Sequence, residues 1–155
     1  RNTVTSAGRV CFLCGETGLL TMALPSGRIL CYPQVRAELV ETPYGEEWEL
    51  SAIKANWRPK EGEKEWPRVR LYGGLLAENA TQAAAADILR NALVDLVELD
   101  WPVVGHTHDE LLLEVEHDEV EEATAQLRRA MLTAPGWAVG LPLNCELWTG
   151  ARYRK

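Results

Sequence analysis

The stretch WPVVGHTHDELLLEVE, residues 101–116, decides the fold of the region around it. Residues 102–107 and 111–115 form two short apolar runs, and the polar tripeptide HDE at 108–110 separates them. Two such runs joined by a short polar break predict an antiparallel β-hairpin with the tripeptide at its turn. The turn would present the carboxylate of Asp109 on a stiff support. Mg²⁺ is usually held by one or two carboxylates together with substrate phosphates, so this turn is a candidate magnesium site.

Helical periodicity flanks the hairpin on both sides. Before it, apolar residues recur at steps of three and four over residues 74–99, which predicts one long helix. After it, an amphipathic helix is expected from a cap at Asp118 to Leu132. The run at 141–147 then predicts a last strand, followed by a basic tail.

Residues 1–70 show no helical period. Residues 1–18 are punctuated by glycine, whereas 19–24 and 29–32 predict two strands around a turn. A further strand is expected over 35–40, and one or two more around an exposed loop within 46–68. The three tryptophans of this last segment are interpreted as packing anchors rather than ligand platforms: Trp48, Trp57 and Trp66.

These elements predict an α+β fold, in which helices pack on one face of an antiparallel sheet that contains the hairpin. One segment of four successive parts is expected. It has strands, turns and a loop at 1–70, a long helix at 71–100, the hairpin at 101–116, and a helix, a strand and a basic tail at 117–155.

Composition narrows the class of protein. The formal net charge of −7 argues against a simple basic nucleic-acid-binding module. Residues 94–122 contain eleven acids and no Lys or Arg, while five bases and one acid follow from 123 onward. This pattern is compatible with a cation site between phosphate-facing surfaces, but plain solvated faces account for most of these charges individually. No apolar run reaches membrane-spanning length and no signal peptide opens the chain. Its first residue is Arg1 rather than Met, which favours a processed or excised segment.

The cysteines give a weak metal signal. Four cysteines are too few for a disulfide scaffold in a chain of 155 residues, so a reduced, cytosolic compartment is expected. Cys11 and Cys14 form half of a zinc-ribbon pattern, but no second pair follows at a suitable spacing.

An alternative interpretation of the hairpin is a metallohydrolase site, in which His106, His108 and Asp109 would be the metal ligands. The HxHxDH pattern of the metallo-β-lactamase fold needs Asp and His where this chain has Glu110 and Leu111. The residues therefore do not match that pattern.

Four stretches, in order along the chain, resemble the C-terminal part of family A, bacterial polymerase-I-like DNA polymerases, and in particular their phage-encoded branch. The stretches are LPSGRILCYP (24–33), LYGGLLAENATQAAAAD (71–87), PVVGHTHDELLLEVE (102–116) and GLPLNCELWTGARYRK (140–155). The hairpin matches the family's motif C, and the helix with Gln82 and Asp87 matches its Q-helix. The resemblance implies an incomplete polymerase palm.

The resemblance also implies roles for the hairpin residues in DNA-directed DNA synthesis. Asp109 corresponds to the palm carboxylate that binds two catalytic Mg²⁺ ions. Glu110 is secondary, and His108 supports the primer-terminal nucleotide. The implied partners are primer–template DNA and deoxynucleoside triphosphates.

Four other residues are expected to contact DNA. Gln82 matches a glutamine that contacts minor-groove acceptors, which are nearly the same for every correct base pair. Asn79 is the other amide nearby, although the family pattern places its amide at the position occupied here by Glu78. The tail residues Arg152 and Arg154 are expected to contact phosphates.

One departure from the family limits the activity expected of the chain alone. The second metal carboxylate, in a D-Y/F-S-x-x-E-like motif, and the fingers helix that grips the triphosphate have no counterpart in this sequence. A complementary polymerase polypeptide is therefore the expected partner, with the bacterial host cytoplasm as the location. The alternative is a non-catalytic, palm-derived DNA-binding or assembly module.

Overall fold

The computed structural model describes residues 3–153, and these form two compact units, residues 3–82 and 83–153. The α+β class is confirmed, because antiparallel strands and two α-helices make up the described chain. The described antiparallel strands are divided among sheets of four, three and two strands. The long helix α1 (Gly73–Glu98) begins in the first unit and continues into the second.

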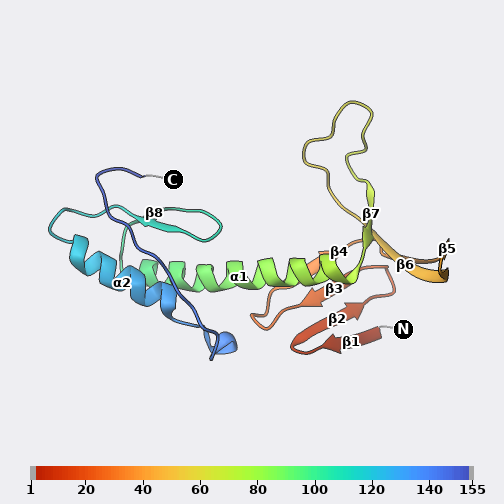
Figure 1. Cartoon of the computed structure of the whole chain (residues 1–155), viewed down its shortest axis with the longest axis horizontal. Helices are drawn as coiled ribbons and strands as arrows, with labels where there is room; N and C mark the ends of the chain where they lie inside the picture. The colour runs from red at the N-terminus through yellow and green to blue at the C-terminus, as the bar shows by residue number, and fades with distance from the viewer. Residues whose placement is uncertain (1–2, 154–155) are drawn as a thin grey trace. The chain divides into compact units, whose positions relative to one another are not determined.

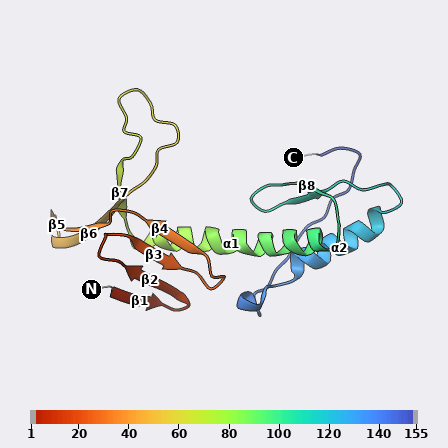
Figure 2. The same cartoon turned by 180° about the vertical axis from the view of Figure 1, so that it is seen from behind.

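The first unit opens with a meander of four antiparallel strands (Figures 1 and 2). These strands are β1 (Thr3–Ala7), β2 (Val10–Cys14), β3 (Leu20–Ala23) and β4 (Ile29–Tyr32). The strands expected at 19–24 and 29–32 are confirmed, whereas the first two strands were missed. Phe12 pairs with Met22, a fully buried core residue.

A second sheet follows, with β5 (Arg36–Thr42), β6 (Gly45–Ile53) and β7 (Arg68–Leu71) in that order. The two sheets separate at Gln34, whose φ of 52° turns the chain out of the extended conformation. Backbone bonds join them again at 3.0 Å from Ile53 N to Pro33 O and 2.7 Å from Val35 N to Gly18 O. The guanidinium of Arg68 donates to the carbonyl of Gln34 at 2.8 Å.

The tryptophans of the 46–68 segment are not packing anchors. Trp48, Trp57 and Trp66 are 71%, 90% and 61% exposed. Trp48 lies on β6, and the other two lie on the loop between β6 and β7.

The second unit has one hydrophobic core. The C-terminal half of α1, the hairpin of β8 (Val103–His106) and β9 (Leu111–Leu113), and α2 (Val120–Leu132) supply it. Its buried residues are Ala92, Leu96, Leu111 and Ala130. For this hairpin, the expectation that helices pack on one face is confirmed.

Helix ends in the second unit differ in detail from the expectation. The cap of α2 is Glu119 rather than Asp118, and Ala123 N donates to the Glu119 carbonyl at 2.9 Å. After α1, Asp100 takes a φ of 60°, and Trp101 N donates back to Leu96 O at 3.0 Å. These two features form a Schellman-type helix end.

The last expected strand, at 141–147, is also wrong. Residues 141–147 have no regular secondary structure, and the short 3₁₀ turn Gly136–Ala138 lies before them. Their burial nevertheless alternates as in a strand, with Leu143, Cys145 and Leu147 half-buried and their neighbours exposed. Pro142 has no N–H to donate, and within residues 3–153 no strand pairs with this segment. Neither helix of the described chain is both long and apolar enough to span a membrane.

Candidate active-site hairpin

The predicted hairpin is confirmed. β8 and β9 pair antiparallel, with His106 opposite Leu111 and an irregularity between Val103 and Gly105. Thr107 N donates to the carbonyl of Glu110 at 3.0 Å, which closes the turn. The turn is anchored by Leu111, which is buried in the core of the second unit. The intervening residues are therefore held at the end of a packed ribbon.

The two acids of the turn have different surroundings. Asp109 is exposed, and within residues 3–153 it makes no hydrogen bond or ion pair. Glu110 is half-buried and accepts two hydrogen bonds through Oε2, from the Thr107 hydroxyl at 3.1 Å and from the Tyr153 hydroxyl at 3.0 Å. One carboxylate is thus available for a ligand, while the other is occupied by the protein.

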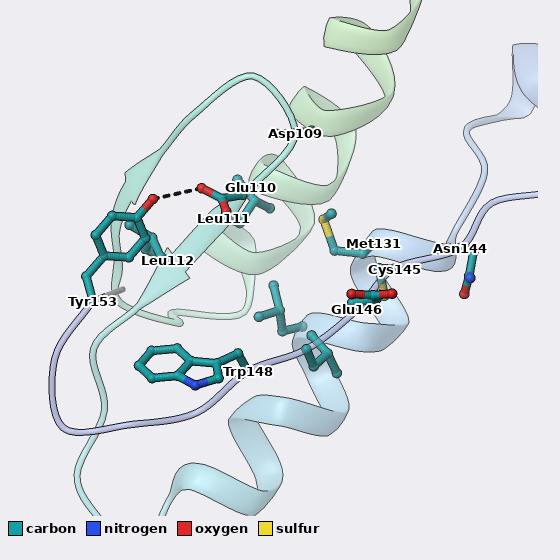
Figure 3. Close-up of a pocket in the computed structure, with 12 residues that line it drawn as sticks. Asp109, Glu110, Leu111, Leu112, Met131, Asn144, Cys145, Glu146, Trp148 and Tyr153 are labelled. Carbon is teal, nitrogen blue, oxygen red and sulfur yellow. Dashed lines mark hydrogen bonds between the residues drawn. The ribbon is translucent and has the colours of Figure 1, made fainter. Parts of the chain in front are cut away.

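The contact with Glu110 also affects Tyr153. Donating to the carboxylate raises the pKa of the Tyr153 phenol above its usual value of 10.0, and partial desolvation and the negative charge of Glu110 add to the rise. The phenol is therefore protonated at neutral pH and can remain a donor. Figure 3 shows its hydroxyl directed at Glu110, with the C-terminal segment beside the hairpin.

A cavity of about 700 Å³ lies against the turn. The hairpin, α2 and the segment after it all line the cavity (Figure 3), and its polar and aromatic residues include Asp109, Glu110, Glu146, Trp148 and Tyr153. Gly150 allows the Trp148 ring to lie close to the backbone, because a Cβ at position 150 would overlap that ring. The chain reversal between Trp148 and Tyr153 therefore depends on this glycine.

Sequence reasoning missed Tyr153 and Trp148 as members of this site. The tail was interpreted only through its arginines, and no local pattern links Tyr153 to an acid 43 residues earlier. Arg152 is exposed next to Tyr153, and Arg154 lies outside the described residues.

The two amides predicted to contact DNA lie on the part of α1 that belongs to the first unit. Gln82 is exposed and has no hydrogen-bond partner among the described residues. Asn79 is half-buried, and its amide donates to the Tyr32 hydroxyl at 3.0 Å. Asn79 therefore links α1 to β4, a structural role that the sequence did not indicate.

The alternative metal sites lack converging ligands. Cys11 and Cys14 are three residues apart on β2, so their side chains leave opposite faces of the strand. His106 and His108 are both exposed. Among the described residues, no group of three or more His, Cys, Asp or Glu side chains is close enough to hold a metal ion. A single exposed carboxylate such as that of Asp109 could hold Mg²⁺ only together with other ligands.

Comparison with known proteins supplies the family. The chain is 36% identical over 141 residues to the DNA polymerase of Bacillus phage SP02, a match that covers 90% of this chain and 20% of that polymerase. It is 37% identical over 73 residues to the thermostable DNA polymerase I of Thermus filiformis, which covers 44% of this chain and 8% of that enzyme. No protein-family model and no solved structure matches the chain. The chain spans about one fifth of the phage relative's length, and the resemblance is confirmed: this chain is related to a segment of polymerase-I-like DNA polymerases, of the phage-encoded branch.

Proposed function

We propose that this chain is part of a DNA-directed DNA polymerase and supplies one catalytic carboxylate, Asp109, for nucleotidyl transfer in DNA replication. The observation that carries the proposal is the contrast within the turn. Asp109 is exposed beside a cavity of about 700 Å³ and has no partner within residues 3–153, while Glu110 is bound by Thr107 and Tyr153.

Asp109 fits a magnesium site as one ligand among several. Mg²⁺ favours oxygen ligands and is commonly held by one or two carboxylates with substrate phosphates and water. With Asp109 among its ligands, Mg²⁺ would supply charge stabilisation for the oxygens that attack and leave during nucleotidyl transfer. The remaining carboxylate and the fingers would come from another part of the polymerase, either on a separate polypeptide or on a longer chain.

Glu110 is assigned a positioning role. Its carboxylate accepts from both Thr107 and Tyr153, which fixes the turn and leaves this acid occupied by internal hydrogen bonds. His108 is exposed beside Asp109 and is assigned to the primer-terminal nucleotide. Arg152 adjoins Tyr153 and so lies near the hairpin, where its guanidinium can bind a phosphate of the substrate or of DNA.

Gln82 is assigned to the DNA minor groove near the primer terminus. Its amide is exposed and free of partners within the described chain, so it can accept or donate without loss of an internal bond. Asn79 is a weaker candidate, because a DNA contact would compete with its bond to Tyr32. The proposed location is the cytoplasm of a bacterial host, because one relative is named as the DNA polymerase of a Bacillus phage.

Primer extension with Mg²⁺ tests this proposal. The full chain is assayed alone and mixed with a polypeptide that carries the fingers and the other palm carboxylate. The same assays are repeated with the Asp109→Asn variant and with Asp118→Asn, a control that makes the same change in charge. Asp118 is exposed and outside the cavity lining, so it is a matched acid.

The expected result is extension only on mixing, with a loss of at least about a hundredfold for Asp109→Asn and little change for Asp118→Asn. Extension that is indifferent to Asp109→Asn would refute the assigned role. If primer–template binds but no mixture extends it, the chain is a palm-derived binding module instead.

A further inference from the structure

Figure 1 shows the loop at 54–67 between β6 and β7, and hydrogen bonds within this loop give it a defined conformation. Two backbone bonds extend the hairpin into it, from Lys54 N to Pro67 O at 3.1 Å and from Asn56 N to Glu65 O at 2.7 Å. The carboxylate of Glu63 accepts from the Asn56 amide at 3.1 Å and from Lys60 N at 3.2 Å, which joins the two arms of the loop.

Two tryptophans line one small cavity on this loop. Trp57 comes from the first arm and Trp66 from the second, and they share a cavity of about 260 Å³ with Asn56, Pro59 and Glu65. The rings remain mostly exposed, although indole rings ordinarily lose much of their surface to packing. This volume lies just below the range of pockets that enclose a drug-sized ligand, so it suits a single planar ring.

The loop at 54–67 carries four cations against three acids, so its net charge favours an anionic ligand. Lys54, Arg58, Lys60 and Lys64 are exposed, and no ion pair holds their side chains within residues 3–153. Of the three acids in the loop, Glu63 is already occupied by internal hydrogen bonds. Glu65 lines the cavity and can accept a hydrogen bond from the amino group of cytosine or adenine.

We propose that Trp57 and Trp66 form a stacking site for a base of single-stranded nucleic acid, with the free cations of the loop contacting its phosphates. Aromatic platforms beside basic side chains are the usual means of binding single strands without reading their sequence. The site uses neither Asp109 nor a metal ion. An experiment can therefore refute this stacking site without refuting the proposed polymerase function, and the reverse also holds.

Fluorescence anisotropy of a labelled, mixed-sequence single-stranded DNA of about a dozen nucleotides tests the proposal in EDTA, where no primer extension occurs. The full chain is compared with Trp57→Ala, Trp66→Ala and the control Trp48→Ala. Trp48 is exposed on the adjacent strand but does not line the cavity. Each of the three changes removes one exposed tryptophan side chain, so their effects on solubility and folding are comparable.

We expect Trp57→Ala and Trp66→Ala each to weaken binding by about five-fold to a hundredfold, while Trp48→Ala has little effect and Trp57→Phe retains most of the affinity. Arg58→Gln should reduce the slope of log affinity against log salt by about 0.7, the value for one phosphate contact on a single strand.

Equal binding by wild type, Trp57→Ala and Trp66→Ala would overturn the proposal, as would equal losses in all three alanine variants. Duplex DNA of the same sequence that bound as tightly, with the same dependence on these tryptophans, would also overturn it. If no single strand bound at all, the tryptophans would be assigned to a protein partner instead, and the proposal would be rejected.

Discussion

Leu96 is the residue whose truncation should most affect the unit that carries the hairpin. Its side chain is 0% exposed, in a core shared by α1, α2 and Leu111 of β9. Leu96→Ala removes three carbon atoms, whose transfer from water contributes about 2.4 kcal/mol at 0.8 kcal/mol for each CH₂ group. An unfilled cavity adds to this loss, so the free energy of unfolding should fall by about 3 to 4 kcal/mol.

Leu99→Ala is the matched control for this change. Leu99 is the same residue type three positions further along but is 59% exposed, so its truncation should change the free energy of unfolding by less than about 0.5 kcal/mol. Both variants are compared with wild type by urea titration, followed by far-ultraviolet circular dichroism. The signal comes mainly from α1 and α2, the helices that form this core.

A thermal scan gives an independent value. For a chain of this length, a loss of 3 to 4 kcal/mol lowers the midpoint by roughly 6 to 16 °C. If Leu96→Ala were no more destabilising than Leu99→Ala, the packing of the hairpin on α1 would be wrong. The rigid support inferred for Asp109 would then lose its basis.

Three other changes test local contacts. Asp100 takes a φ of 60°, which glycine adopts at less cost, so Asp100→Gly should raise the free energy of unfolding in urea by about 0.5 kcal/mol; a loss of stability would contradict the described helix end. Tyr32→Phe removes the acceptor of the Asn79 amide and should lower the same quantity by about 1 kcal/mol, whereas no change would show that this bond does not hold α1 to β4. The pKa of Tyr153 is raised by its bond to Glu110, so NMR of labelled tyrosine should show it titrating above pH 10.0, and Glu110→Gln should move it back towards the usual value. The pKa of Tyr153 is higher in the folded state than in the unfolded state. The stability from this contact is therefore fully present below pH 10.0 and is lost as pH rises through the folded-state pKa. Titration of Tyr153 like a free tyrosine would refute the contact.

The sequence predicted those elements whose pattern is local. The 3.6-residue period predicted α1 within one residue at each end, and two apolar runs around HDE predicted the hairpin of β8 and β9. Strand β2 was missed because VCFLC at 10–14 is a short run of mostly apolar residues, in which no alternation of polar and apolar types is visible.

The contacts that define the candidate site could not be predicted, because they join distant parts of the chain. The bond from Tyr153 to Glu110 spans 43 residues, and the bond from Asn79 to Tyr32 spans 47. The tryptophans at 57 and 66 were assigned to packing by residue type alone. Their exposure is a property of the folded chain, which residue type does not determine.

The most direct test of the central claim places these residues in a whole polymerase. The aligned segment of the phage SP02 DNA polymerase, to which this chain is 36% identical over 141 residues, is replaced by this chain, and Mg²⁺-dependent primer extension is measured. The account predicts extension by the chimera and by its Asp118→Asn variant. For Asp109→Asn it predicts a loss of at least about a hundredfold with primer–template binding unchanged. A chimera that extended primers equally well with asparagine at position 109 would contradict the account.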